Sequence, residues 1–182
     1  MLKSLTLIAA AVALTIGALA TGPAPAHAAH SHLVASSAGC PGDNSTTSSS
    51  AAQLRAMRCL VNTARRRAGL STLRTDRVLE RAASIKASRI EACGQFTHTP
   101  CGAPFTASFR AAGWRGETMG ENIAYGQSYL GTPRAIFEAW LASPDHRANL
   151  LRPSFRRHGL AVRTANLPGV GLVQLWVHAF GR

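Results

Sequence analysis

The sequence predicts an α+β domain over residues 51–182, in which helices cover both faces of a central, mainly antiparallel sheet. Two observations lead to this three-layer α/β/α arrangement. Apolar residues recur at helical spacing through the first part of the domain, and the last part changes to two runs rich in β-branched and aromatic residues. The second run, residues 170–180, is apolar at nearly every position, which indicates a strand covered by helices on both faces.

The first two helices are predicted from spacing and capping residues. Over residues 53–68 apolar side chains recur at steps of three and four, and Gly69 ends the helix. A second helix begins after Thr75 or Asp76, because either side chain can accept hydrogen bonds from the free N–H groups of the first turn. The many alanines on one side of this helix predict close packing against a neighbouring element.

The middle of the domain is expected to hold shorter elements. A short helix is predicted around residues 105–112, and residues 120–124 form a turn that continues into a brief extended or helical piece. Thr132 precedes a first-turn proline and begins a further helix, and Ser143 repeats this start signal for another helical turn.

The last elements are two strands. Residues 159–162 and residues 170–180 are expected to pair antiparallel, because a turn at residues 166–169 separates them.

Two segments precede the domain. Residues 1–28 are typical of a secretory signal peptide, with Lys3, an uncharged stretch of 16 residues and a small-residue cleavage site. That stretch is shorter than the roughly 20 residues a membrane-spanning helix needs, so the mature chain is expected to be secreted and extracellular, with no transmembrane segment. Residues 29–50 are rich in Ser and Thr and have almost no large apolar side chains, which predicts a flexible linker.

The four cysteines favour disulfides, because an exported chain reaches an oxidising compartment. Cys93 and Cys101 flank a short loop and are expected to pair, which leaves Cys40 for Cys59. A zinc site built from cysteines would need a Cys-x-x-Cys pair or a Cys/His cluster, and the sequence has neither.

The chain carries a net charge of +12, which favours anionic partners. Apart from Lys3, the only lysine is Lys86, so an arginine-rich composition explains the charge as well as a binding role does. No aromatic-interleaved basic motif is present, which disfavours nucleic acid as the partner and leaves attachment to an anionic surface as an alternative.

Several segments, in chain order, resemble the bacterial type of the CAP superfamily, named for cysteine-rich secretory proteins, antigen 5 and pathogenesis-related proteins. The similar segments are Leu60-Val61-Asn62, Phe96-Thr97-His98, Gly120-Glu121-Asn122-Ile123-Ala124, residues 139–151, and the final strand with Trp176. This resemblance implies the CAP (SCP-like) α/β/α sandwich over residues 51–182, and extracellular residence.

The resemblance also implies a cavity lined by two histidines and two acids. His98 and His146 match the histidines, Glu121 matches one acid, and Asn122 beside it is a further ligand-binding candidate. The second acid has no clear match. The nearby candidates are Glu117, Glu138 and Asp145.

Three kinds of chemistry fit His98, Glu121 and His146. They can form a hydrogen-bond network, they can bind zinc or another divalent cation, or they can be catalytic. The network is favoured over the metal. Catalysis comes last, because the sequence contains neither a Gly-x-Ser-x-Gly elbow nor a His-Glu-x-x-His helix.

The expected function is therefore binding of an extracellular lipid, peptide or cell-wall component at this cavity. The alternatives are a metal-dependent extracellular hydrolase and a polyanion-binding surface protein. Trp114, in a loop beside Arg115, is the tryptophan expected to face a partner, whereas His158 and His178 are expected at the surface or in packing contacts.

Overall fold

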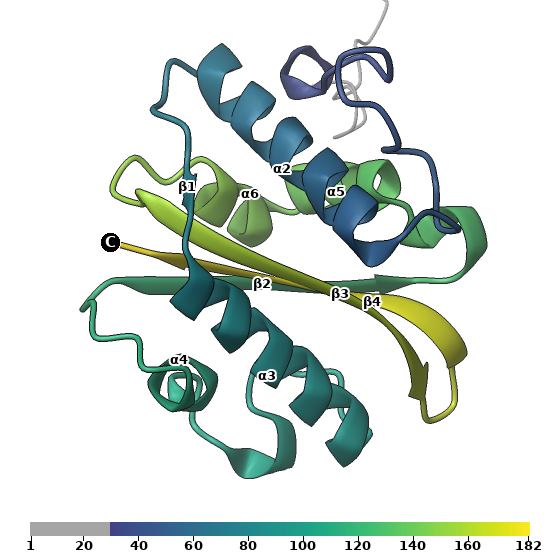
Figure 1. Cartoon of the computed structure of the whole chain (residues 1–182), viewed down its shortest axis with the longest axis vertical. Helices are drawn as coiled ribbons and strands as arrows, with labels where there is room; N and C mark the ends of the chain where they lie inside the picture. The colour runs from purple at the N-terminus through teal and green to yellow at the C-terminus, as the bar shows by residue number, and fades with distance from the viewer. Residues whose placement is uncertain (1–29) are drawn as a thin grey trace, which may run out of the picture.

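A computed structural model of the chain describes residues 30–182, and the expected signal peptide at residues 1–28 lies outside them. A four-stranded sheet runs through the middle of the molecule, with one layer of helices above it and another below it (Figure 1). The prediction of an α+β domain with three layers is therefore confirmed.

The sheet is mainly antiparallel, with the strand order β1-β3-β4-β2. Its strands are β1 (Arg74–Thr75), β2 (Met119–Gly126), β3 (Arg157–Leu167) and β4 (Gly171–Gly181). The long strands β2 and β3 both pair antiparallel with β4, while the two residues of β1 pair parallel with β3. The predicted C-terminal hairpin is confirmed. The segment expected to be a turn with a brief extended or helical piece is instead part of the full strand β2.

Three helices cover one face of the sheet: α2 (Ser50–Arg67), α5 (Pro133–Ala142) and α6 (Pro144–Leu150). Local capping sets where two of them start, because Ser49 Oγ accepts a hydrogen bond from Ala52 N (3.3 Å) and Thr132 Oγ1 accepts one from Ala135 N (3.2 Å). Their apolar faces pack on the sheet around a cluster of large buried side chains. Among its members are Met57, Phe137, Trp140, Trp176 and Phe180.

The other face is covered by α3 (Arg77–Cys93) and α4 (Ala107–Ala111). Asp76 caps α3, as predicted, by accepting hydrogen bonds from two main-chain N–H groups. The close packing predicted from the alanines is confirmed at Ala83, which is fully buried, and at Gly159 of β3. A Cβ on Gly159 would lie 2.0 Å from main-chain atoms of α3, so only glycine lets helix and strand approach this closely.

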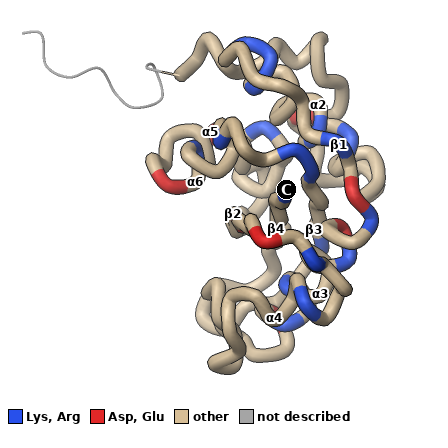
Figure 2. Tube along the Cα trace, turned by 90° about the vertical axis from the view of Figure 1, so that its left-hand side faces the viewer, with Lys and Arg blue, Asp and Glu red and all other residues tan. Residues whose placement is uncertain are grey.

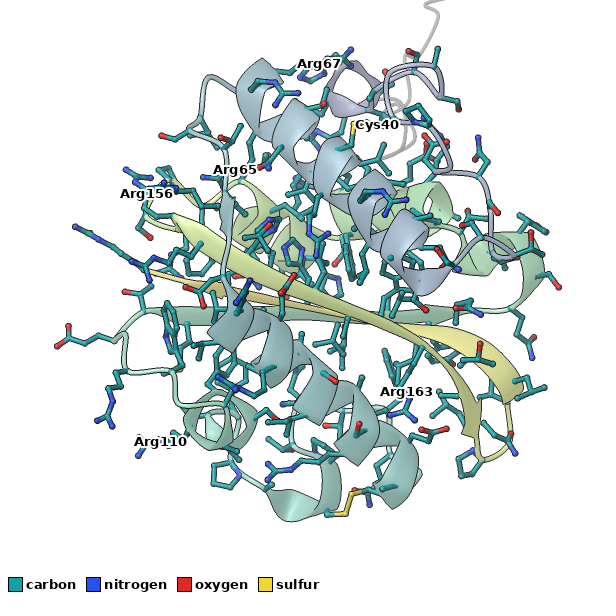
Figure 3. All side chains as sticks on the ribbon, in the orientation of Figure 1. Cys40, Arg65, Arg67, Arg110, Arg156 and Arg163 are labelled. Atoms are coloured by element: carbon teal, nitrogen blue, oxygen red, sulfur yellow. A yellow bond between two sulfur atoms is a disulfide. The ribbon has the colours of Figure 1, made fainter. Side chains whose placement is uncertain are left out.

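Three short 3-10 segments complete the chain: η1 (Ser31–Leu33), η2 (Pro100–Gly102) and η3 (Ser128–Gly131). Both expected disulfides are present, Cys40–Cys59 and Cys93–Cys101, and the second is the yellow bond at the lower end of α3 in Figure 3.

Residues 30–49 differ from the flexible linker that their composition predicts. Leu33 is buried in the core below α2, and Asp43 pairs with Arg134 of α5 at 2.5 Å. Arg67 donates hydrogen bonds to two main-chain carbonyls of the tract. Composition underestimates how well such a segment is ordered. One disulfide, the buried side chain of Leu33 and a few arginine contacts stabilise it, and a count of apolar residues does not include them.

His158 and His178 form a buried pair in the core between the sheet and α2. The two rings share a hydrogen bond, with 2.9 Å between His158 Nδ1 and His178 Nε2. The ring of His178 also contacts Trp140 and Phe180 at tilted angles, with ring centres 5.8 Å and 3.8 Å away. Both side chains are buried, so they serve in packing and not at the surface. Burial, then the nearby charges of Arg58 and Arg65, lower the pKa of His158 to about 4.

This pair predicts that the protein loses stability in mild acid. In the unfolded chain His158 takes up a proton below about pH 6.5, whereas in the folded chain it stays neutral down to about pH 4. The free energy of unfolding should therefore fall by ~3 kcal/mol for His158 between these pH values, and His178 should add to the loss because burial also lowers its pKa. Urea unfolding at a series of pH values would measure this. A His158→Leu/His178→Leu variant with the same pH dependence as the wild type would contradict the assignment.

Candidate functional site

The candidate site is centred on a contact between His98 and Glu121. Glu121 lies on β2 with a side chain that is 1% exposed, and its Oε1 is 2.8 Å from Nδ1 of His98. His98 lies in the loop between α3 and α4, and its side chain is 45% exposed. A buried carboxylate thus orients a half-exposed imidazole, whose Nε2 has no hydrogen-bond partner in residues 30–182.

A buried lysine completes this contact. Lys86 Nζ lies 3.2 Å from Glu121 Oε1, and both side chains are 1% exposed. The same ammonium donates a hydrogen bond to the main-chain carbonyl of His98 and lies 5.6 Å from the ring centre of Phe105. Lys86 therefore neutralises the buried carboxylate and holds the loop that carries His98. We call Lys86, Glu121 and His98 the charged cluster.

Lys86 was not predicted as a site residue, because an arginine-rich composition explained the charge of the chain equally well. A signal was present. Lys86 is the only lysine after Lys3 in a chain whose other cations are arginines, and it falls on the buried side of α3 between Ala83 and Ile90. A charged residue on the apolar side of a helix indicates a buried partner.

His146 lies near the charged cluster without contacting it directly. Its Nδ1 is 2.9 Å from Ser143 Oγ at the start of α6. Burial lowers the pKa of His146, the charge of His98 lowers it further, and Asp145 acts in the opposite direction. The structure therefore brings His98 and Glu121 together, and places His146 within electrostatic range of them.

Asn122, predicted as a further ligand-binding residue, is fully buried and makes its side-chain hydrogen bonds within the protein. Alternation along β2 directs its side chain to the opposite side of the strand from Glu121. Its amide donates to the main-chain carbonyl of His146 (2.9 Å) and accepts from Asn149 Nδ2 (2.9 Å). The role that the structure gives Asn122 is to tie α6 to β2.

None of the three candidates for a second acid reaches the charged cluster. Glu117 and Asp145 are exposed, and Glu138 pairs with Arg134 on α5 at 3.2 Å. Asp145 acts on one of the two imidazoles, since its charge raises the pKa of His146.

The described residues do not fit the divalent cation that the family resemblance implies. No three His, Cys, Asp or Glu side chains within residues 30–182 lie close enough together to share a metal ion. The charge of Glu121, the one carboxylate available, is already compensated by Lys86. A divalent ion beside that ammonium would meet strong like-charge repulsion in a buried setting, so the chemistry of these residues does not fit such an ion.

Aromatic side chains flank the cluster. Phe96 and Tyr125 are 41% and 38% exposed and meet edge to face, with ring centres 4.7 Å apart. Phe96 precedes His98 by two residues, and Tyr125 shares the β2 face of Glu121. Phe105 packs on the other side of His98, with ring centres 6.4 Å apart. The loop that carries the half-exposed imidazole of His98 thus also carries one ring of an exposed aromatic pair.

Comparisons with known proteins agree with this fold. The family described as "Cysteine-rich secretory protein family" (CAP) matches residues 59–177. A curated relative, the uncharacterized protein YkwD of Bacillus subtilis, is 36% identical over 103 residues, which cover 56% of this chain and 38% of the relative.

Solved structures show the same fold at low sequence identity. An outer surface protein of Borrelia burgdorferi superposes with a TM-score of 0.62 at 19% identity, covering 74% of this chain and 96% of the other. An extracellular protein of Bacillus anthracis that contains an SCP domain superposes with a TM-score of 0.58 at 20% identity, covering 76% of this chain and 45% of the other. A cysteine-rich secretory protein of Staphylococcus aureus superposes with a TM-score of 0.60 at 18% identity, covering 74% of this chain and 40% of the other.

The present chain thus spans less than half of the length of YkwD and of two of these structures. No helix within residues 30–182 combines the length and apolar character that crossing a membrane requires.

Proposed function

This chain belongs to the cysteine-rich secretory protein (CAP) family, and from that premise we propose that it is a secreted protein that binds an extracellular ligand beside His98. Secretion is supported by the two disulfides, which persist in oxidising compartments, and by relatives described as extracellular and outer surface proteins. It also agrees with the signal peptide predicted for residues 1–28.

The observation that carries the proposal is the half-exposed imidazole of His98, held in place by a buried ion pair. Burying a lysine and a glutamate is costly unless their geometry is well satisfied, and here the pair fixes a group that solvent reaches. Within residues 30–182 the Nε2 of His98 is free, and the contact with Glu121 fixes the orientation of the ring, so this nitrogen is well placed to hydrogen-bond to a ligand.

The exposed pair Phe96–Tyr125 indicates the rest of the ligand. Two aromatic rings in contact at the surface offer an apolar platform, and Phe96 precedes His98 by two residues in the same loop. We therefore expect an amphipathic ligand whose polar end bonds to His98 and whose apolar part covers the rings. A lipid fits this description best, while a peptide or cell-wall fragment with an apolar side group fits it less fully.

A metal-dependent hydrolase gains no support from this site. Its mechanism needs a cation held by His98, His146 and Glu121, but Glu121 is neutralised by Lys86 and His146 is directed to Ser143. Glu121 orients the ring of His98, so His98 Nε2 is placed to accept a proton. No hydroxyl or thiol among the described residues contacts this nitrogen, so the site has no side-chain nucleophile for it to activate.

The proposal predicts that small molecules stay bound during purification and depend on His98. Mass spectrometry of organic and aqueous extracts of the purified protein should find a retained molecule, and His98→Ala should lower its amount roughly fivefold or more through loss of a hydrogen bond. Tyr125→Ala should do the same through loss of apolar contact.

Tyr129→Ala is the matched control. Tyr129 lies in η3 and is 75% exposed, so this substitution removes an exposed aromatic ring outside the site. Extracts free of small molecules, or retention unchanged by His98→Ala, would refute a ligand site at His98.

A further inference from the structure

A pocket opens at the edge of the molecule where β4 ends. Its walls come from the loop after α4, the start of α3 and the end of the sheet, and its volume is about 320 Å³. Its lining residues include Trp114, Arg115, Arg157 and Arg182. None of its lining residues belongs to the charged cluster or to the aromatic pair, so it is a separate feature of the fold.

Trp114 is held firmly. Its main-chain N–H donates to the carbonyl of Phe109 at 2.9 Å. Its six-membered ring lies so close to Gly116 and Gly181 that a Cβ on either glycine would be 2.6 Å or 2.3 Å from a ring atom. The two glycines let the indole lie flat against the main chain, which leaves the ring few alternative positions.

Arginine side chains outnumber acidic side chains in the lining of this pocket. Asp76 is the only acidic side chain in its lining, and that carboxylate already caps α3 and pairs with Arg157 at 3.1 Å. The side chains of Arg115 and Arg182 have neither an ion pair nor a hydrogen bond with any part of the chain that the structure describes. Figure 2 views the molecule from this side, and basic segments lie above and below the C-terminus.

The indole N–H adds an unusual feature. Trp114 Nε1 is buried and has no acceptor within the described residues, whereas Trp140 Nε1 donates to Ile123 O and Trp176 Nε1 donates to Gly131 O. A buried donor without a partner is uncommon in folded proteins, and it distinguishes Trp114 from the other two tryptophans.

We propose that this pocket binds an oxyanionic group, a phosphate or a carboxylate, carried on a flat ring that packs against Trp114. Arg115 and Arg182 hold the oxyanion, because two unpaired guanidinium groups match the geometry and charge of such groups. Trp114 supplies the flat apolar surface for the ring. The site is independent of ligand binding at His98.

The test uses phenyl phosphate and benzoate as probes, since each joins an aromatic ring to one of the two oxyanions. Proton–nitrogen NMR spectra of the protein should contain three indole N–H signals, and Trp114→Phe identifies the one from Trp114. On titration with the better probe, this signal should shift, whereas the signals from Trp140 and Trp176 should stay fixed.

Charge-matched variants separate a site from general attraction. Arg115→Gln/Arg182→Gln should weaken binding of the better probe roughly tenfold or more, as expected for losing a charge-assisted hydrogen bond. Arg55→Gln/Arg66→Gln removes the same charge from exposed positions on α2 and should leave the affinity within about twofold.

A shift with phenyl phosphate alone assigns a phosphate ligand, and a shift with benzoate alone assigns a carboxylate ligand. Equal weakening by the two double variants would overturn the proposal, because the net charge would then explain binding. A Trp114 signal that moves with neither probe would overturn it as well.

Discussion

Replacing Lys86 with methionine is expected to lower the free energy of unfolding by about 3–5 kcal/mol. The substitution keeps the length of the apolar stem and removes the ammonium, so the carboxylate of Glu121, 1% exposed, loses the cation at 3.2 Å. It also removes the donor to the main-chain carbonyl of His98. Urea unfolding, followed by circular dichroism, measures the change.

A double variant makes this prediction specific. In Lys86→Met/Glu121→Gln no uncompensated charge is buried, so the loss should be smaller than the sum of the losses in the two single variants. A loss below about 1 kcal/mol for Lys86→Met would mean that water reaches Glu121, and the buried ion pair would have to be abandoned.

A loss of similar size, about 3–5 kcal/mol, is expected when Arg65 of α2 is replaced by methionine. Arg65 is fully buried, and its guanidinium donates to the main-chain carbonyls of Ser71, Leu150, Arg152 and Phe155 at 2.8–3.3 Å (Figure 3). Burial, then the charge of Arg156, lower the pKa of Arg65, yet the guanidinium remains charged near neutral pH. One side chain therefore ties α2 to the segment between α6 and β3.

The neighbouring residue provides the control. Arg66 is exposed and makes a single hydrogen bond, to Thr63 Oγ1 at 2.9 Å. Arg66→Met should change the free energy of unfolding by no more than about 0.5 kcal/mol. If Arg65→Met and Arg66→Met have equal effects in urea unfolding, the four carbonyl contacts do not stabilise the fold.

The two residues illustrate how this small domain uses charge inside its layers. Lys86 lies in the layer of α3 and Arg65 in the layer of α2, and each fixes a loop next to the sheet through main-chain carbonyls. For the proposed function the Lys86 result matters more, because His98 should lose its fixed position together with the ion pair. Ligand retention in Lys86→Met should then fall along with stability.

Most of the helices could be predicted from the sequence because their signals are local. The period of residues 53–68, the cap at Asp76 and the Thr132-Pro133 start all act within a few residues, and α2, α3 and α5 follow them. The hairpin of β3 and β4 was likewise predicted from the two runs rich in β-branched residues and the turn between them. The disulfides followed from spacing and elimination among four cysteines.

The strand β2 was missed because its sequence does not alternate in the usual way. Gly120 and Asn122 are buried on one side, and Glu121 is buried on the other, so no apolar stripe marks a strand. Eight residues of β2 pair with residues of β4, and this pairing keeps the segment in an extended conformation. The partner residues lie more than 40 positions further along the chain. Long-range pairing overrode a weak local pattern.

The amino-acid sequence was sufficient to predict most helices, the C-terminal hairpin, the cysteine pairs and the family resemblance. The folded structure was needed to show that Lys86 neutralises Glu121, that Asn122 faces the core, and that residues 30–49 pack on α2. The two kinds of feature differ in how far apart in the chain the interacting residues lie. Capping and periodicity act over one or two turns of the chain, whereas the charge state and exposure of a side chain depend on partners that folding brings from distant segments.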